Sequence, residues 1–163
     1  MTRLISLVFI AVLLLQGACQ PQSPAPKEPA PELAASMGDL QRFAHKLGLS
    51  LHHANQPLAQ FYLHEMEETL EEISEKIPTH NGLPIKDLLS TILLPPLTQL
   101  ETALKHGDFE QSLQLWPGVI QSCNRCHAAT EHAFIRIGDI RENPFNQDFS
   151  PQTHAQAPPS SAP

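Results

Sequence analysis

The sequence predicts an all-α protein, an antiparallel four-helix bundle with up-down-up-down topology. Four segments between residues 32 and 137 place apolar residues at alternating spacings of four and three, which is the period of an amphipathic helix. The connections between these segments are short, and short connections favour antiparallel neighbours. None of the segments shows the two-residue alternation of a half-buried strand.

Residues 1–18 are typical of an export signal. Arg3 supplies a short positive region, and the apolar run that follows is too short for a comfortable transmembrane helix. Cys19 directly follows Gly-Ala, which resembles the lipobox of bacterial lipoproteins, with Gln16 in place of the usual leucine. We expect a lipoprotein-type signal with lipid on Cys19. The alternative is ordinary secretion, with Cys19 spare or removed.

A domain covering residues 33–146 is expected between two proline-rich ends. Residues 19–32 predict an extended linker that would hold the domain away from a membrane. Residues 147–163, rich in proline, serine and glutamine, have the composition of a disordered tail. The chain carries a formal net charge of -7, which argues against nucleic acid or anionic lipid as a partner.

The first helix is expected from about Glu32 or Met37 to about His53. Its apolar seam comprises Leu33, Met37, Leu40, Ala44, Leu47 and Leu51. Asn55-Gln56-Pro57 interrupts the pattern and opens a second helix that should reach about Ile77. The expected buried side of this second helix comprises Leu58, Tyr62, Met66, Leu70, Ile73 and Ile77.

A third helix is expected from about Pro84 to His106, after a loop over residues 78–82. Pro95-Pro96 removes two amide donors, so the helix should kink or split near Leu94.

The fourth helix should begin at a capping pair formed by Asp108 and Gln111, directly after Gly107. We expect it to extend through Ile137, with a bend or a restart after Trp116 caused by Pro117. Its predicted inward seam comprises Phe109, Leu113, Trp116, Ile120, Cys123, His127, Thr130, Phe134 and Ile137.

The fourth helix also contains Cys123-Asn124-Arg125-Cys126-His127, which reads C-x-x-C-H, the attachment signature of a c-type haem. Two cysteines three apart lie about one helical turn from each other, so their sulfurs can bond both vinyl groups of one porphyrin. His127 would then bind the iron as the axial ligand. A zinc site would need two further ligands, and a thioredoxin-like pair would need a βαβ context. The sequence therefore predicts one covalently bound haem c, wedged into the bundle core.

Beyond this motif, the chain resembles the cytochrome c′/c-556 class of exported bundle cytochromes, and more closely a group of bacterial c-type cytochromes related to that class. The resemblance covers most of residues 37–149 and implies haem carried by Cys123 and Cys126, with His127 on the iron. After His127, cytochrome c′ usually has an aromatic residue and an arginine soon afterwards, and this chain has Ala-Ala-Thr. The segments that carry the resemblance are His45-Lys46-Leu47 through Asn55, Leu58 to Glu65, Leu94-Pro95-Pro96, Cys123 to His127, and Phe134-Ile135.

The sixth position of the iron separates the functional hypotheses. In the c-556 type a methionine early in the first helix fills this position, and Met37 lies there on the inward seam. A thioether ligand favours a low-spin centre suited to electron transfer. Two alternatives remain open: an empty or apolar distal site with Met37 as a core filler, or a histidine, of which His45 is the best placed.

The expected function is single-electron transfer by an exported, periplasmic monohaem cytochrome, tethered to the membrane through lipid on Cys19. The alternative is a five-coordinate haem module that binds NO or CO. We do not expect an enzyme, since no distal acid–base pair is recognisable. The acidic charge favours a redox partner with a basic patch, and the resemblance is compatible with a homodimer. Arg136 and Arg141 are candidates for neutralising haem propionates, with plain surface arginines as the alternative.

Overall fold

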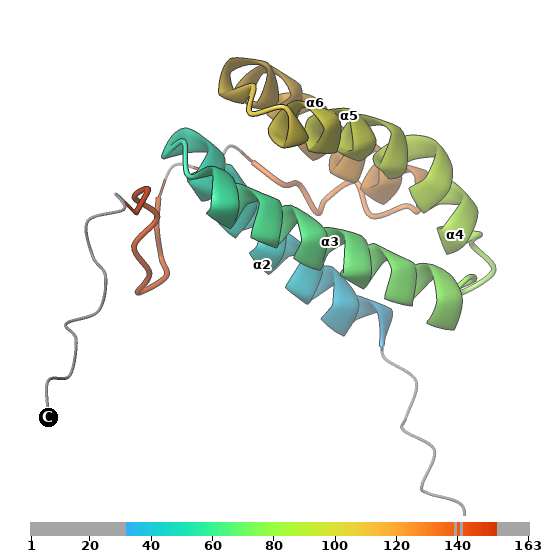
Figure 1. Cartoon of the computed structure of the whole chain (residues 1–163). Helices are drawn as coiled ribbons and strands as arrows, with labels where there is room; N and C mark the ends of the chain where they lie inside the picture. The colour runs from blue at the N-terminus through green and yellow to red at the C-terminus, as the bar shows by residue number, and fades with distance from the viewer. Residues whose placement is uncertain (1–31, 139, 141, 153–163) are drawn as a thin grey trace, which may run out of the picture.

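The computed structural model describes residues 32–138, 140 and 142–152. Four helices of this part pack against one another, which confirms the all-α prediction (Figure 1). They are α2 (Leu33–His52), α3 (Gln56–Lys76), α5 (Leu94–Lys105) and α6 (Phe109–Ala129). A short helix α4 (Ile85–Leu88) and a π-helical turn η1 (Leu89–Leu93) lead into α5.

The helices form two pairs, α2 with α3 and α5 with α6, and further contacts join α3 to α5 and α2 to α6. Figure 1 shows the chain after α6 returning along the bundle, between the two pairs. We call this part the C-terminal segment; it is described over residues 131–138, 140 and 142–152. The fully buried core takes side chains from all four helices, among them Leu47, Leu51, Met66, Leu70, Ile73, Leu97, Leu100 and Val119.

The first two helices follow the predicted seams closely. Helix α2 begins at Leu33, the earlier of the two expected starts, and its seam residues from Leu40 onward are buried. Asn55 caps α3, because its Oδ1 accepts a hydrogen bond from the Leu58 N–H at 3.3 Å. Pro57 lies in the first turn of α3, where an amide donor is not required.

The third predicted helix is split just before its proline pair, as expected. The break takes the form of η1, in which the Leu94 N–H bonds to the Leu89 carbonyl, five residues back. Pro95 and Pro96 then stand in the first turn of α5, where missing N–H groups cost least.

Helix α6 begins at the predicted cap, since the Asp108 carboxylate accepts a hydrogen bond from the Gln111 N–H at 2.9 Å. The helix continues through Pro117, so the prediction of a restart after Trp116 is wrong. Pro117 leaves the carbonyl of Leu113 without its helical donor. Both residues are exposed, and water can replace the missing bond there.

The buried face of α6 matches the predicted seam only in part: Trp116 is buried, and Phe109, Ile120 and Cys123 pack against the core, but other positions differ. Leu113 is 37% exposed, whereas Ser112, Val119 and Ser122 are completely buried. The serine hydroxyls donate to backbone carbonyls of their own helix, Ser112 to Asp108 at 2.6 Å and Ser122 to Val119 at 2.7 Å. Because these hydroxyls are satisfied locally, the polar side chains can lie on the buried face.

Helix α6 ends at Ala129, so the predicted continuation to Ile137 is wrong. Glu131 takes a left-handed backbone conformation with φ of 63°. The Glu131 N–H bonds to the Ala128 carbonyl at 3.3 Å, and the His132 N–H bonds to the His127 carbonyl at 2.7 Å. This pair of bonds is the Schellman motif, which terminates a helix. Phe134, expected on the inward seam, is 80% exposed.

The packed part of the chain extends past the expected domain boundary at residue 146. Phe149 is 2% exposed and lies in the core. Its carbonyl accepts a hydrogen bond from the Asn55 side chain at 3.1 Å, and the Tyr62 hydroxyl donates to the Gln147 side chain at 2.8 Å. The beginning of the expected tail is therefore a structural part of the bundle.

Several sequence predictions fall on residues outside the described ranges. They are the export signal (1–18), the lipidation site Cys19, most of the linker (19–31) and the tail from residue 153 onward. Among the described helices, none combines the length and the apolar character needed to cross a bilayer.

Candidate functional site

The C-x-x-C-H residues lie on the last turns of α6 and line one cavity of about 390 Å³. Cys123 and Cys126 are free, half-buried thiols one helical turn apart. His127 follows on the same helix and lines the same space. The structure thus brings together all three motif residues, and we call this space the α2–α6 cavity.

The walls of the α2–α6 cavity are mostly apolar. Helix α2 supplies one side, and α4 with η1 supplies another; Ile135 and Ile137 of the C-terminal segment also line the space. The volume falls within the range of about 300–1,000 Å³ that is usual for small-molecule sites. The apolar residues contributed by the helices include Leu33, Met37, Leu40, Ala44, Leu88, Leu89 and Leu93.

Both thiols of the motif are held in their neutral form. Burial raises the pKa of Cys123 to about 11, and the nearby Cys126 raises it further. Burial also raises the pKa of Cys126, against the opposing effect of Arg125. Reactive redox cysteines need a lowered pKa, because the thiolate is the nucleophile. The surroundings of these thiols therefore count against the thiol–disulfide interpretation.

The imidazole of His127 is oriented by the C-terminal segment. Its Nδ1 lies 2.9 Å from the Ile135 carbonyl oxygen, which can only accept, so we assign the proton to Nδ1. In the neutral imidazole, Nε2 is then the unprotonated nitrogen and can bind a metal. Metal-ligating histidines usually donate their other ring N–H in this way, which fixes the ring and raises the basicity of the ligating nitrogen.

The two residues proposed for the sixth position lie in different places. Met37 is half-buried on α2 and lines the α2–α6 cavity, as expected for a residue facing Cys123 and His127. The Nε2 of His45 lies 2.8 Å from the Glu142 carbonyl oxygen, and its ring packs edge-on against Phe145. His45 is not among the residues that line the cavity.

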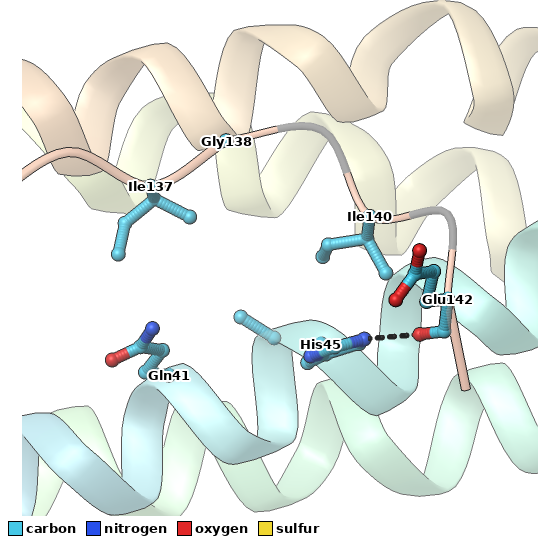
Figure 2. A pocket seen from close by; sticks show the side chains of 7 residues that line it. Gln41, His45, Ile137, Gly138, Ile140 and Glu142 are labelled. Atoms are coloured by element: carbon cyan, nitrogen blue, oxygen red, sulfur yellow. Dashed lines mark hydrogen bonds between the residues drawn. The ribbon is translucent and has the colours of Figure 1, made fainter. Parts of the chain in front are cut away.

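His45 instead lines a neighbouring hollow of about 430 Å³, which we call the outer groove. It lies between α2 and the C-terminal segment (Figure 2), with Ile137 and Ile140 on one side and Gln41 on the other. Gln41, Ala44 and Ile137 line both spaces, so the outer groove adjoins the α2–α6 cavity.

Sequence reasoning missed two histidines that line the α2–α6 cavity, His80 and His132. His80 lies in the loop between α3 and α4 and pairs with Leu83 in an isolated bridge. His132 follows the end of α6, with Nδ1 at 2.5 Å from the Thr130 carbonyl. Both stand outside helices, where no periodicity could have indicated them. Arg136 is exposed, and Arg141 lies outside the described residues.

The residues of the α2–α6 cavity fit the needs of a covalently attached haem: two thiols, an imidazole with a free nitrogen, and apolar walls. By contrast, no group of three or more His, Cys, Asp or Glu side chains in the described part of the chain is arranged to hold a metal ion directly. Comparison with protein-family models, with curated proteins and with solved structures finds no match to this chain.

Proposed function

We propose that the chain is an exported monohaem c-type cytochrome that transfers single electrons. The observation that carries the proposal is the meeting of Cys123, Cys126 and His127 in one apolar cavity, with the Nδ1 of His127 engaged by the Ile135 carbonyl. A haem bound there would supply the one-electron chemistry of its iron. The chain's own residues would anchor it, ligate it and keep water away.

The neutral thiols suit covalent attachment. Cys123 and Cys126 would hold the haem as thioethers, and forming a thioether from an S–H group needs no oxidant and releases no leaving group. Cys123 and Cys126 stand one helical turn apart on the wall of the cavity. Both could therefore reach the same porphyrin from one side, with His127 beside them.

Met37 is the proposed sixth ligand. It lies on α2, which packs against α6, and it lines the cavity that the motif residues share. Together with the imidazole of His127, its thioether would favour a low-spin iron with a raised potential, which suits electron transfer.

The second candidate function is binding of NO or CO at a five-coordinate iron. It is favoured by the apolar character of the α2 wall, where Leu33, Leu40 and Ala44 offer no ligand atoms. In that case Met37 would only fill space beside the iron.

Absorption spectra of the purified holoprotein in both redox states separate these functions. Electron transfer predicts a sharp low-spin ferrous spectrum that CO does not change. A high-spin spectrum that shifts with CO would support gas binding and exclude Met37 as a ligand. The double variant Cys123→Ala plus Cys126→Ala should carry no covalent haem; retention of covalent haem in this variant would overturn the proposal.

The proposed setting is the periplasm, with lipid on Cys19 as the membrane anchor. The formal net charge of -7 favours a redox partner with a basic patch. Fractionation of the wild type and of Cys19→Ser tests the anchor: the variant should leave the membrane fraction and still carry haem. A wild type that is equally soluble would remove the lipid from the proposal.

A further inference from the structure

Asn124, which directly follows the first cysteine of the motif, makes a paired contact with the backbone of the C-terminal segment. Its Nδ2 donates to the Ile137 carbonyl at 2.9 Å, and its Oδ1 accepts from the Ile137 N–H at 2.8 Å. One side-chain amide thus satisfies both backbone groups of one residue, as a neighbouring strand would do. The partners lie thirteen residues apart in the sequence, so the contact closes a loop that begins at the end of α6.

Within this loop the backbone is fixed at two further points. The His132 N–H bonds to the His127 carbonyl at 2.7 Å, and the Ile135 N–H bonds to the His132 carbonyl at 2.8 Å. The Ile135 carbonyl then meets the Nδ1 of His127 at 2.9 Å. The Ile135 carbonyl, which orients His127, therefore belongs to a residue that lies in the sequence between the turn that ends α6 and Ile137, the residue that Asn124 contacts.

Part of this loop is exposed to solvent. Phe134 and Ile135 are 80% and 42% exposed, so core packing does little to hold them. The next buried anchor is Ile140, whose Cδ1 lies close to Gly48 of α2. In the described part of this stretch, the two hydrogen bonds of Asn124 hold Ile137, and the Nδ1 of His127 contacts the carbonyl of Ile135.

We propose that Asn124 is a positioning residue of the site: its amide clamps Ile137 and thereby holds the Ile135 carbonyl against the Nδ1 of His127. Ile135 and Ile137 also line the α2–α6 cavity, so the same clamp keeps this wall in place. The clamp is independent of the proposed haem, whereas its effect on the iron rests on the proposed function.

The clamp itself is tested by amide hydrogen exchange of Ile137 in the full chain. Asn124→Ala removes the acceptor of this N–H, and exchange should become about tenfold faster, as expected for the loss of a hydrogen bond that protects against local opening. Asn124→Gln keeps both amide atoms on a longer side chain, so its exchange rate at Ile137 should lie between the rates of Asn124→Ala and the wild type. Gln121→Ala, at an exposed position one turn earlier on α6, is the matched control and should behave as wild type.

The effect on His127 is tested by the reduction potential of the holoprotein. Loss of the Nδ1–H hydrogen bond makes Nε2 a weaker ligand, which favours the reduced iron, so Asn124→Ala should shift the potential to a more positive value. Asn124→Gln should shift it less, and Gln121→Ala should leave it unchanged.

Unchanged exchange at Ile137 in Asn124→Ala would overturn the clamp. Faster exchange with an unchanged potential would overturn the positioning of His127. If the wild type carries no covalent haem, the proposed function fails, and the exchange of Ile137 still decides whether the clamp exists.

Discussion

The two ring nitrogens of His127 have different surroundings, because a backbone carbonyl contacts only one of them, Nδ1. The Ile135 carbonyl accepts a hydrogen bond from Nδ1–H, which leaves Nε2 as the nitrogen that could bind a metal. Met37 of α2 lines the same cavity. At the scale of single residues, the sulfur of Met37 therefore distinguishes the two proposed functions, as a ligand in one and a space filler in the other.

We predict that Met37→Leu converts the holoprotein from a low-spin to a high-spin spectrum and lowers its reduction potential. Leucine replaces the volume of methionine at a cost below about 1.5 kcal/mol, so the bundle should remain folded. It removes the only soft ligand atom that α2 presents to the cavity in the described part of the chain. Absorption spectroscopy and a redox titration measure both effects.

Met66→Leu is the matched control for this prediction. Met66 is completely buried on α3 and belongs to the core rather than to the lining of the cavity. The same chemical change there should leave the spectrum and the potential as they are in the wild type. If Met37→Leu also keeps the low-spin spectrum, another group occupies the sixth position, and His80 and His132 become the residues to substitute next.

Helix α6 shows what the pattern of a single element can and cannot predict. Its start was predictable, because Asp108 and Gln111 form a local capping pair that needs no tertiary information. The positions of Cys123 and Cys126 followed from helical spacing. The end of the helix was missed because Glu131, not glycine, occupies the left-handed position of the Schellman turn.

The pattern of a single element also fails to predict the buried serines of α6 and the position of His80. Burial of Ser112 and Ser122 depends on hydrogen bonds back to their own helix, and a hydropathy pattern assigns such residues to the polar face. His80 reaches the cavity from a loop, where it pairs with Leu83 in an isolated bridge, and helical periodicity carries no information about such a position. The all-α fold and the position of the motif on a helix were therefore predictable, whereas the loop residues that line the cavity were not.

We predict that Glu131→Gly stabilises the domain by up to about 1 kcal/mol. A non-glycine residue in the left-handed region costs about 1–2 kcal/mol, and the greater backbone entropy of glycine in the unfolded chain cancels part of the gain. Equilibrium unfolding in denaturant measures the difference. Gln121→Gly, at an exposed position in the interior of α6, should instead destabilise by about 1 kcal/mol. A loss of stability in both variants would contradict the role given to Glu131.

At the scale of the whole molecule, the bundle is completed by the C-terminal segment. Tyr62 and Asn55 of the α2–α3 pair bond to Gln147 and Phe149, while Asn124 of α6 bonds to Ile137. The segment thus joins both helix pairs and contributes a wall of the cavity between them (Figure 1). Composition alone assigns residues 147–152 to a tail, because proline and polar residues dominate and only Phe149 is large and apolar.

We predict that Phe149→Ala destabilises the protein by about 3–5 kcal/mol, the usual cost of removing a buried aromatic side chain. Phe149 is 2% exposed and packs near Tyr62, with ring centroids 6.4 Å apart, so its loss leaves a cavity at the junction of α2, α3 and the C-terminal segment. Phe134→Ala, the same change at a side chain that is 80% exposed, should alter stability by no more than about 0.5 kcal/mol. Denaturant titration of the two variants beside the wild type tests this directly. Equal, small effects would mean that residues after 146 are dispensable for folding; a large loss confined to Phe149→Ala would show that the segment which walls the site also holds the bundle together.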